Sequence, residues 1–202
     1  VEPGCSEALV AWLQRMRFRM QVEISDQSSI WAVLAATNSD RVNDGSPAVL
    51  LDPWPSIQPG SVGYGPTPHP GEDFHLWFWL QPRQELSGSN YDSYAGTLAL
   101  DALLLRAARP LLASDVDEKA LPHEWDWLRT AVHLNKGCYR GQETVAKIHN
   151  LGHPPRRAVL LHLDGSLGVL PEPGAAVMQG DREVGRLTRV GRHHEWGPIA
   201  LG

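Results

Sequence analysis

The sequence contains little cysteine and no long hydrophobic run. Among its 202 residues there are two cysteines, Cys5 and Cys138, which are too few and too far apart for a disulfide framework. No apolar run is long enough to cross a bilayer, and none has the character of a secretory signal peptide. These absences predict a cytoplasmic protein from a reducing compartment that does not bind membranes.

Several motifs and charge patterns are also missing. The chain has no P-loop, no G-x-S-x-G elbow and no Cys-x-x-Cys pair, and it lacks the dense basic stripe of a general nucleic-acid-binding protein. Residues 1–135 carry 9 Lys and Arg against 17 Asp and Glu, whereas residues 136–202 carry 9 against 6. The cationic C-terminal part suits a small anionic ligand, although a solvated basic face explains it equally well.

The most informative stretch is the run K-G-C-Y-R-G-Q-E at residues 136–143, which we name the signature loop. It is neither apolar nor periodic, so it is not typical of core packing. Its two glycines permit close backbone approach, and a helix predicted over residues 141–149 begins within it. Cys138 lies before that helix between two cations, and both features favour the thiolate form of its side chain.

This run resembles the K-G-C-Y-x-G-Q-E signature of the YgfZ-like folate-binding proteins, which are relatives of the aminomethyltransferase (T-protein) of the glycine cleavage system. Residues 115–124 (DVDEKALPHE) and 191–202 (GRHHEWGPIALG) also resemble the actinobacterial branch. The resemblance implies that the chain binds tetrahydrofolate or another folate derivative. It further implies an accessory role in iron–sulfur cluster assembly or repair, with client proteins such as radical enzymes that modify tRNA.

Two departures separate this chain from aminomethyltransferases. Those enzymes tend to carry Arg-x-Glu, with the glutamate holding the pterin ring, where this chain has Arg106-Ala107-Ala108. They also lack a cysteine in the signature, where this chain has Cys138. Both differences favour the accessory factor, and a folate-dependent aminomethyl or one-carbon transferase stays the alternative.

The resemblance assigns the site to the signature loop. Three roles fit Cys138: carrying a one-carbon unit, exchanging with a disulfide or persulfide, or sharing in the ligation of a partner's iron. A buried small residue that packs the ring centre is the structural alternative. Lys136 is the expected electrostatic partner of the thiol. The predicted folate contacts are Gly137, Tyr139, Arg140, Gly141, Gln142 and Glu143, with Gln142 and Glu143 also able to cap the helix.

Other polar groups receive structural interpretations. His193-His194-Glu195 has the composition of a metal cluster, but neighbouring residues on a strand point to opposite faces, so we predict no metal there. Pro122-His123-Glu124 is expected to cap the following helix rather than to line a pocket. The tryptophans at positions 77, 79, 125 and 127 are typical of a core, although one of them is suitably placed to wall a pterin pocket.

Periodicity predicts an α+β protein. Helices are expected at residues 6–16 with Ser6 as the N-cap, 94–109, 124–133 and 141–149. Strands are expected at 17–24, 31–36, 49–51, 75–80, 158–163, 175–178 and 183–190. The resemblance implies a ring of interleaved domains with mostly antiparallel sheets: residues 1–38 plus 118–155 form a folate-binding domain, 39–117 a second α+β domain, and 156–202 a small C-terminal β-barrel.

The chain begins with Val1 rather than Met, and the resemblance suggests that it lacks the family's N-terminal part and the end of the barrel. The catalytic aspartate of aminomethyltransferases belongs to that N-terminal part. We therefore expect the isolated chain to expose apolar surface.

Overall fold

The computed structural model describes residues 2, 4–42, 45–86, 94–166 and 168–202. The chain divides into two compact units, each built from two segments. Unit 1 comprises Val1–Asp52 and His75–Tyr94, and unit 2 comprises Pro53–Phe74 and Ala95–Gly202. Both units combine helices with antiparallel strands, which confirms the α+β class. The family's ring and its three-domain division stay predictions.

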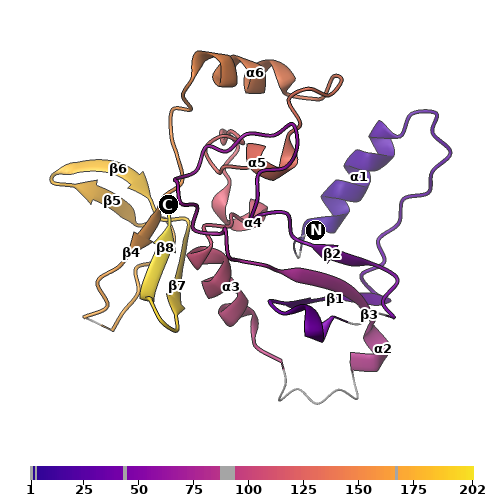
Figure 1. The fold of residues 1–202 in the computed structure, drawn as a ribbon, viewed down its shortest axis with the longest axis horizontal. Coiled ribbons are helices and arrows are strands. Elements are labelled where there is room, and N and C mark those ends of the chain that lie inside the picture. The colour runs from indigo at the N-terminus through magenta and orange to yellow at the C-terminus, as the bar shows by residue number, and fades with distance from the viewer. Residues whose placement is uncertain (1, 3, 43–44, 87–93, 167) are drawn as a thin grey trace. The chain divides into compact units, whose positions relative to one another are not determined.

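Unit 1 is a small antiparallel sheet with an amphipathic helix. Its strands lie in the order β1 (Trp31–Ala36), β3 (Trp77–Pro82), β2 (Val49–Leu51), as Figure 1 shows. Helix α1 (Ser6–Met16) begins and ends where the sequence predicts. Cys5 rather than Ser6 occupies the N-cap position, and it makes no side-chain capping bond, so the predicted cap is wrong. Two shorter helices complete the unit, η1 (Ser39–Arg41) and α2 (Arg83–Leu86).

One face of the unit 1 sheet is apolar and open. Val33 lies opposite Leu80, and Leu50 lies opposite Phe78, so all four side chains point to the same face. Val33 is 62% exposed and Leu50 is 61% exposed. Antiparallel sheets with one solvated face usually place polar residues there. The expectation of exposed apolar surface is therefore met in this unit.

Unit 2 holds the remaining elements. Its helices are α3 (Thr97–Arg106), α4 (Leu112–Asp115), α5 (Leu128–Ala131) and α6 (Gln142–Leu151). Its strands are β4 (Leu160–His162), β5 (Ala176–Gln179), β6 (Arg182–Arg186), β7 (Arg189–His193) and β8 (Gly197–Leu201). Helix α3 packs against β7 and β8 (Figure 1). Across the described parts of both units, no helix combines the length and apolarity needed to span a membrane.

The strands of unit 2 form two open sheets rather than a closed barrel within the described residues. One sheet has the order β4-β8-β7, and the other is the hairpin β5-β6. Every residue of β6 is exposed, and β6 pairs with β5 alone. The predicted C-terminal barrel is therefore corrected to a pair of antiparallel sheets.

The core of unit 2 joins α3 to the C-terminal sheet. Leu105 of α3 packs with Ile199 and Leu201 of β8 and with Trp125. Beside this cluster lies a buried ion pair, in which Arg189 Nε is 2.8 Å from a carboxylate oxygen of Asp115. These contacts fix β8 and the turn at Trp125, and both of these elements line the cavity described below.

Three predicted elements are wrong or altered. Residues 17–24 form no strand, because Met20 N–H donates to the Arg17 carbonyl in a turn and Phe18 has φ +46°. The helix predicted over 124–133 is reduced to α5, since residues 122–127 form successive turns. The single strand predicted over 183–190 is two strands, β6 and β7, and β8 was not predicted at all.

Candidate functional site

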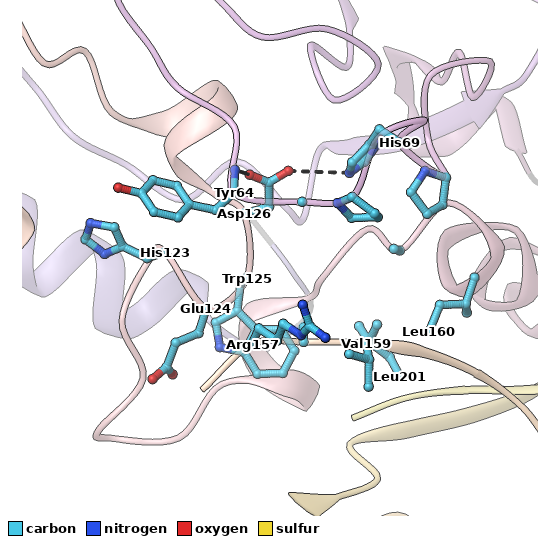
Figure 2. Close-up of a pocket in the computed structure, with 15 residues that line it drawn as sticks. Tyr64, His69, His123, Glu124, Trp125, Asp126, Arg157, Val159, Leu160 and Leu201 are labelled. Carbon is cyan, nitrogen blue, oxygen red and sulfur yellow. Dashed lines mark hydrogen bonds and ion pairs between the residues drawn. The ribbon is translucent and has the colours of Figure 1, made fainter. Parts of the chain in front are cut away.

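Unit 2 contains a cavity of about 440 Å³ (Figure 2). Five parts of the sequence meet around it: the loop before Phe74, the end of α3, the turns at 122–127, the segment leading into β4, and β8. Its lining residues are Tyr64, Gly65, Pro66, His69, Pro70, Ala108, His123, Glu124, Trp125, Asp126, Arg157, Ala158, Val159, Leu160 and Leu201. The volume falls in the range of pockets that bind small organic molecules.

A buried carboxylate, Asp126, organises one side of the cavity. Its side chain accepts the backbone N–H of Tyr64 and pairs with Arg129, whose Nη1 is 2.7 Å from Asp126 Oδ2. Nε2 of His69 lies 3.4 Å from the same oxygen, and Figure 2 shows Asp126 between Tyr64 and His69. Asp126 has φ +54°, a conformation that aspartate adopts more readily than most residues. The carboxylate is thus already engaged by chain groups.

His69 is held neutral beside this carboxylate. Burial and the neighbouring Arg129 lower the pKa of His69 to about 4, and Asp126 opposes the shift only in part. Its Nδ1 accepts the N–H of Gly71 at 3.0 Å, so the ring proton of the neutral form is on Nε2, facing Asp126. His69 therefore serves as a neutral donor that helps to position Asp126.

His123 and Trp125 line the cavity and have buried nitrogens without a hydrogen-bond partner among the described residues. Neither ring nitrogen of His123 makes a hydrogen bond, although the residue is 1% exposed. The indole Nε1–H of Trp125 is also buried without a partner. Burial is the largest cause that lowers the pKa of His123; the backbone of Val145 approaches the ring and opposes this shift only in part, without meeting the geometry of a hydrogen bond. The ring is therefore neutral near pH 7. Such groups are rare in folded proteins because each one costs about 1–3 kcal/mol, and a bound ligand is one way to satisfy them.

Tyr64 connects the cavity to helix α6. Its ring packs edge-on against His123, with 4.9 Å between ring centroids. Its hydroxyl lies 2.9 Å from Nδ1 of His149, a residue of α6. Burial raises the pKa of Tyr64, so the phenol stays protonated. The wall of the cavity thus contacts the helix that follows the signature loop.

The second carboxylate of the cavity, Glu124, is neutralised by Arg156. Nη2 of Arg156 is 2.9 Å from Glu124 Oε2, and Nη1 of the same arginine is 2.9 Å from Asp117. Glu124 also accepts the N–H of Leu121. The next residue, Arg157, is exposed, lines the cavity, and has no ion-pair or hydrogen-bond partner among the described residues.

The signature loop is on the surface. Cys138 is exposed and unbonded, and Lys136, Gly137, Arg140, Gly141 and Glu143 are exposed as well. Lys136 Nζ lies 5.1 Å from the centroid of the Tyr139 ring, a cation–π contact. Gln142 Oε1 accepts the N–H of Tyr139 at 2.9 Å, which orders the start of α6. Gly141 has φ +85° at the N-cap of this helix, so glycine suits the turn.

The structure therefore separates two groups of predicted residues. None of the signature-loop residues lines the cavity, so their folate contacts stay a prediction. His123 and Glu124 do line it, which is the alternative to the helix-capping role preferred for them, and so does Trp125. Ala108, the position at which the resemblance expects a pterin-holding glutamate, is in the same wall with φ +48°.

The sequence pattern missed Tyr64, His69 and Asp126. They belong to a loop rich in glycine and proline and to a turn, neither of which has a periodic signal. The Trp125-Asp126-Trp127 stretch in the family-like segment was the one available indication, because it places a carboxylate between large aromatic residues.

His193, His194 and Glu195 lie closer together than residues along a strand would. β7 ends at His193 and the chain turns at once, so the two imidazole centroids are 4.4 Å apart and the three ligand groups lie within 4.8 Å of one another. His193 Nδ1, however, accepts the N–H groups of Glu195 and Trp196. This places the ring proton on Nε2, which a metal would have to displace. The absence of a metal here stays a prediction.

Comparison with known proteins gives one partial similarity. No family model matches the chain. A chloroplastic protein of Arabidopsis thaliana, named as a candidate transferase, is 31% identical over 112 residues. The match covers 53% of this chain and 24% of the Arabidopsis protein, so the chain corresponds to about a quarter of that relative. The similarity is compatible with the YgfZ and aminomethyltransferase group.

Proposed function

We propose that this chain binds a tetrahydrofolate in the unit 2 cavity and belongs to an accessory factor for iron–sulfur enzymes. The observation that carries the folate site is a cavity of about 440 Å³ whose wall includes His123 and Trp125, two buried residues with unpartnered nitrogens. A pterin ring is flat and has both donors and acceptors along one edge. Once the two side chains turn their nitrogens toward the cavity, such an edge satisfies an imidazole, which offers one donor and one acceptor, together with an indole N–H.

The ion pairs of the two carboxylates in the wall also support a pterin edge that faces His123 and Trp125. Asp126 and Glu124 are occupied by Arg129 and Arg156, and Ala108 has no polar side-chain atom. An aminomethyltransferase-like carboxylate contact to the pterin is therefore missing at Ala108, a loss of about 1.5–3 kcal/mol for a charge-assisted hydrogen bond. Among the buried residues of the wall, His123 and Trp125 have unpartnered polar atoms that could replace it.

The position of Cys138 supports a protein partner for the thiol. Cys138 is exposed and does not line the cavity, so a ligand enclosed there has no contact with it as the structure stands. An exposed thiol can exchange with a disulfide or persulfide of a client, or share in ligating its iron. A cluster ordinarily needs four protein ligands, so one cysteine acts only together with groups of the partner.

The folate site is tested by replacing His123 with Phe, which keeps a flat ring and removes both nitrogens. We expect the variant to be at least as stable as the wild type in the absence of ligand, because two unsatisfied buried atoms are gone. Affinity for 5-formyltetrahydrofolate, measured by isothermal titration calorimetry, should fall about tenfold. Unchanged affinity, or no binding by the wild-type chain, would refute the folate site.

The role of the thiol is tested in cells that lack the protein and are complemented with wild type, Cys138→Ala or the control Cys5→Ala. The readout is the product of a tRNA-methylthiolating iron–sulfur enzyme, measured by mass spectrometry at matched protein levels. We expect Cys138→Ala to abolish rescue and Cys5→Ala to preserve it. Full rescue by Cys138→Ala would remove the thiol from the mechanism.

A folate-dependent aminomethyl or one-carbon transferase is the second candidate. The similarity to an Arabidopsis protein named as a candidate transferase favours it. The two functions are distinguished by an absorbance assay for methylenetetrahydrofolate formed from an aminomethyl donor and tetrahydrofolate. Turnover that survives Cys138→Ala would support the transferase over the accessory factor.

A further inference from the structure

Within the described part of the chain, the wall of the unit 2 cavity has one unpaired positive charge, because both of its carboxylates are in ion pairs. Glu124 is paired with Arg156, and Asp126 is paired with Arg129. His69 and His123 are neutral near pH 7, since burial lowers the pKa of each. Arg157 is the one lining residue whose charge has no counterpart among the residues that the structure describes.

Arg157 also differs from the other polar lining residues in its exposure. His123, Glu124 and Asp126 are buried, whereas Arg157 is exposed and marks the solvent side of the cavity. The next residues, Ala158, Val159 and Leu160, supply apolar wall between Arg157 and the core. The cavity therefore has an uncharged polar part, an apolar wall and a cationic rim.

We infer that Arg157 selects ligands that extend an anionic tail out of the cavity. The inference rests on the proposed folate site, in which the pterin edge meets His123 and Trp125. A folate then directs its glutamate tail toward the rim, where the guanidinium pairs with a tail carboxylate. Because Arg157 is solvated, the pair is screened by salt and contributes moderately to affinity.

The experiment measures binding of three probes to the full 202-residue chain: 6-methyltetrahydropterin, which has neither the aminobenzoate nor the glutamate and so carries no carboxylate, 5-formyltetrahydrofolate with one glutamate, and its triglutamate form. The variants are Arg157→Gln, Arg157→Lys and the control Arg182→Gln. Arg182 is an exposed arginine on β6 that does not line the cavity, so its replacement changes net charge equally.

For the wild type we expect the triglutamate to bind most tightly and the tail-less probe most weakly, with the difference shrinking as salt rises. Arg157→Gln should weaken binding of the two tailed probes about two- to fivefold and leave the tail-less probe unchanged. Arg157→Lys should restore part of the loss, and Arg182→Gln should change nothing.

The possible failures are distinguishable. If all three probes bind the wild type equally, or if Arg157→Gln weakens them equally, the inference is wrong while the folate site stands. If none of the probes binds the wild type, the folate site and this inference both fall. Circular dichroism of each variant verifies that an exposed substitution has left the fold intact.

Discussion

At the scale of single residues, the buried ion pair between Asp126 and Arg129 stabilises the wall of the cavity. The side chains of Asp126 and Arg129 are 10% and 5% exposed, and their atoms are 2.7 Å apart. Asp126→Asn keeps an acceptor for the Tyr64 N–H but leaves the Arg129 charge buried without a counterion. We expect the free energy of unfolding to fall by about 3 kcal/mol in urea denaturation.

Asp117→Asn is the matched control for this change. Asp117 pairs with Arg156 at 2.9 Å, but both side chains are more than half exposed. Water and salt screen such a pair, so its loss should change stability far less than Asp126→Asn does. Equal effects of the two substitutions would show that Asp126 and Arg129 are not a buried pair in solution.

His69 predicts how stability depends on pH. Its pKa is lowered to about 4 in the folded protein, from 6.5 for an ordinary histidine, mainly by burial. The unfolded chain therefore binds a proton below pH 6.5 that the folded chain refuses, so stability should fall as the pH drops from 6.5 toward 4. Melting temperatures over this range should show a shallower decline for His69→Phe. An identical decline in the variant would contradict the assignment.

At the scale of elements, Gly141 at the start of α6 tests whether the signature loop has the conformation described here. Its φ is +85°, and a Cβ added there would meet no atom within 4 Å. Gly141→Ala should therefore be destabilising by about 1 kcal/mol through backbone strain alone. Gly137→Ala is the control, because Gly137 also has open space but no positive φ. Urea denaturation that ranks the two variants equally would exclude this turn.

Elements with local signals were predicted best. The apolar stripe of α1 fixed both of its ends, and β1 was predicted residue for residue. Residues 17–24 alternate between polar and apolar side chains, yet they form no strand, because a strand needs a neighbour to accept its backbone hydrogen bonds. Periodicity describes one segment at a time and contains no information about that neighbour.

The candidate site was predicted less completely for the same reason. The composition of residues 136–143 marks the signature loop, and its helix begins where expected. The cavity, in contrast, brings together Tyr64, His123 and Arg157 from separate parts of the chain. Only the packing of unit 2 joins them, and no spacing in the sequence encodes that packing directly.

At the scale of the whole molecule, the open face of the unit 1 sheet decides how the isolated chain behaves. Val33, Leu50, Phe78 and Leu80 lie on that face, and apart from Gln81 both β1 and β3 are apolar on both of their faces. Strands of that kind are normally covered on both sides. Each fully buried aliphatic side chain contributes about 1.5–3 kcal/mol, so an uncovered face leaves unit 1 weakly stabilised.

We therefore expect the purified chain to bind the dye ANS and to melt without a sharp cooperative transition. Replacing Val33 and Leu50 together with Thr retains β-branched or strand-compatible side chains and makes the face more polar. This double variant should show less ANS fluorescence than the wild type. Val169→Thr is the control, because Val169 is 75% exposed but lies outside the unit 1 sheet. Absence of dye binding together with a sharp calorimetric transition would mean that the face is covered in solution, by rearrangement or by self-association, and sedimentation velocity separates those two outcomes.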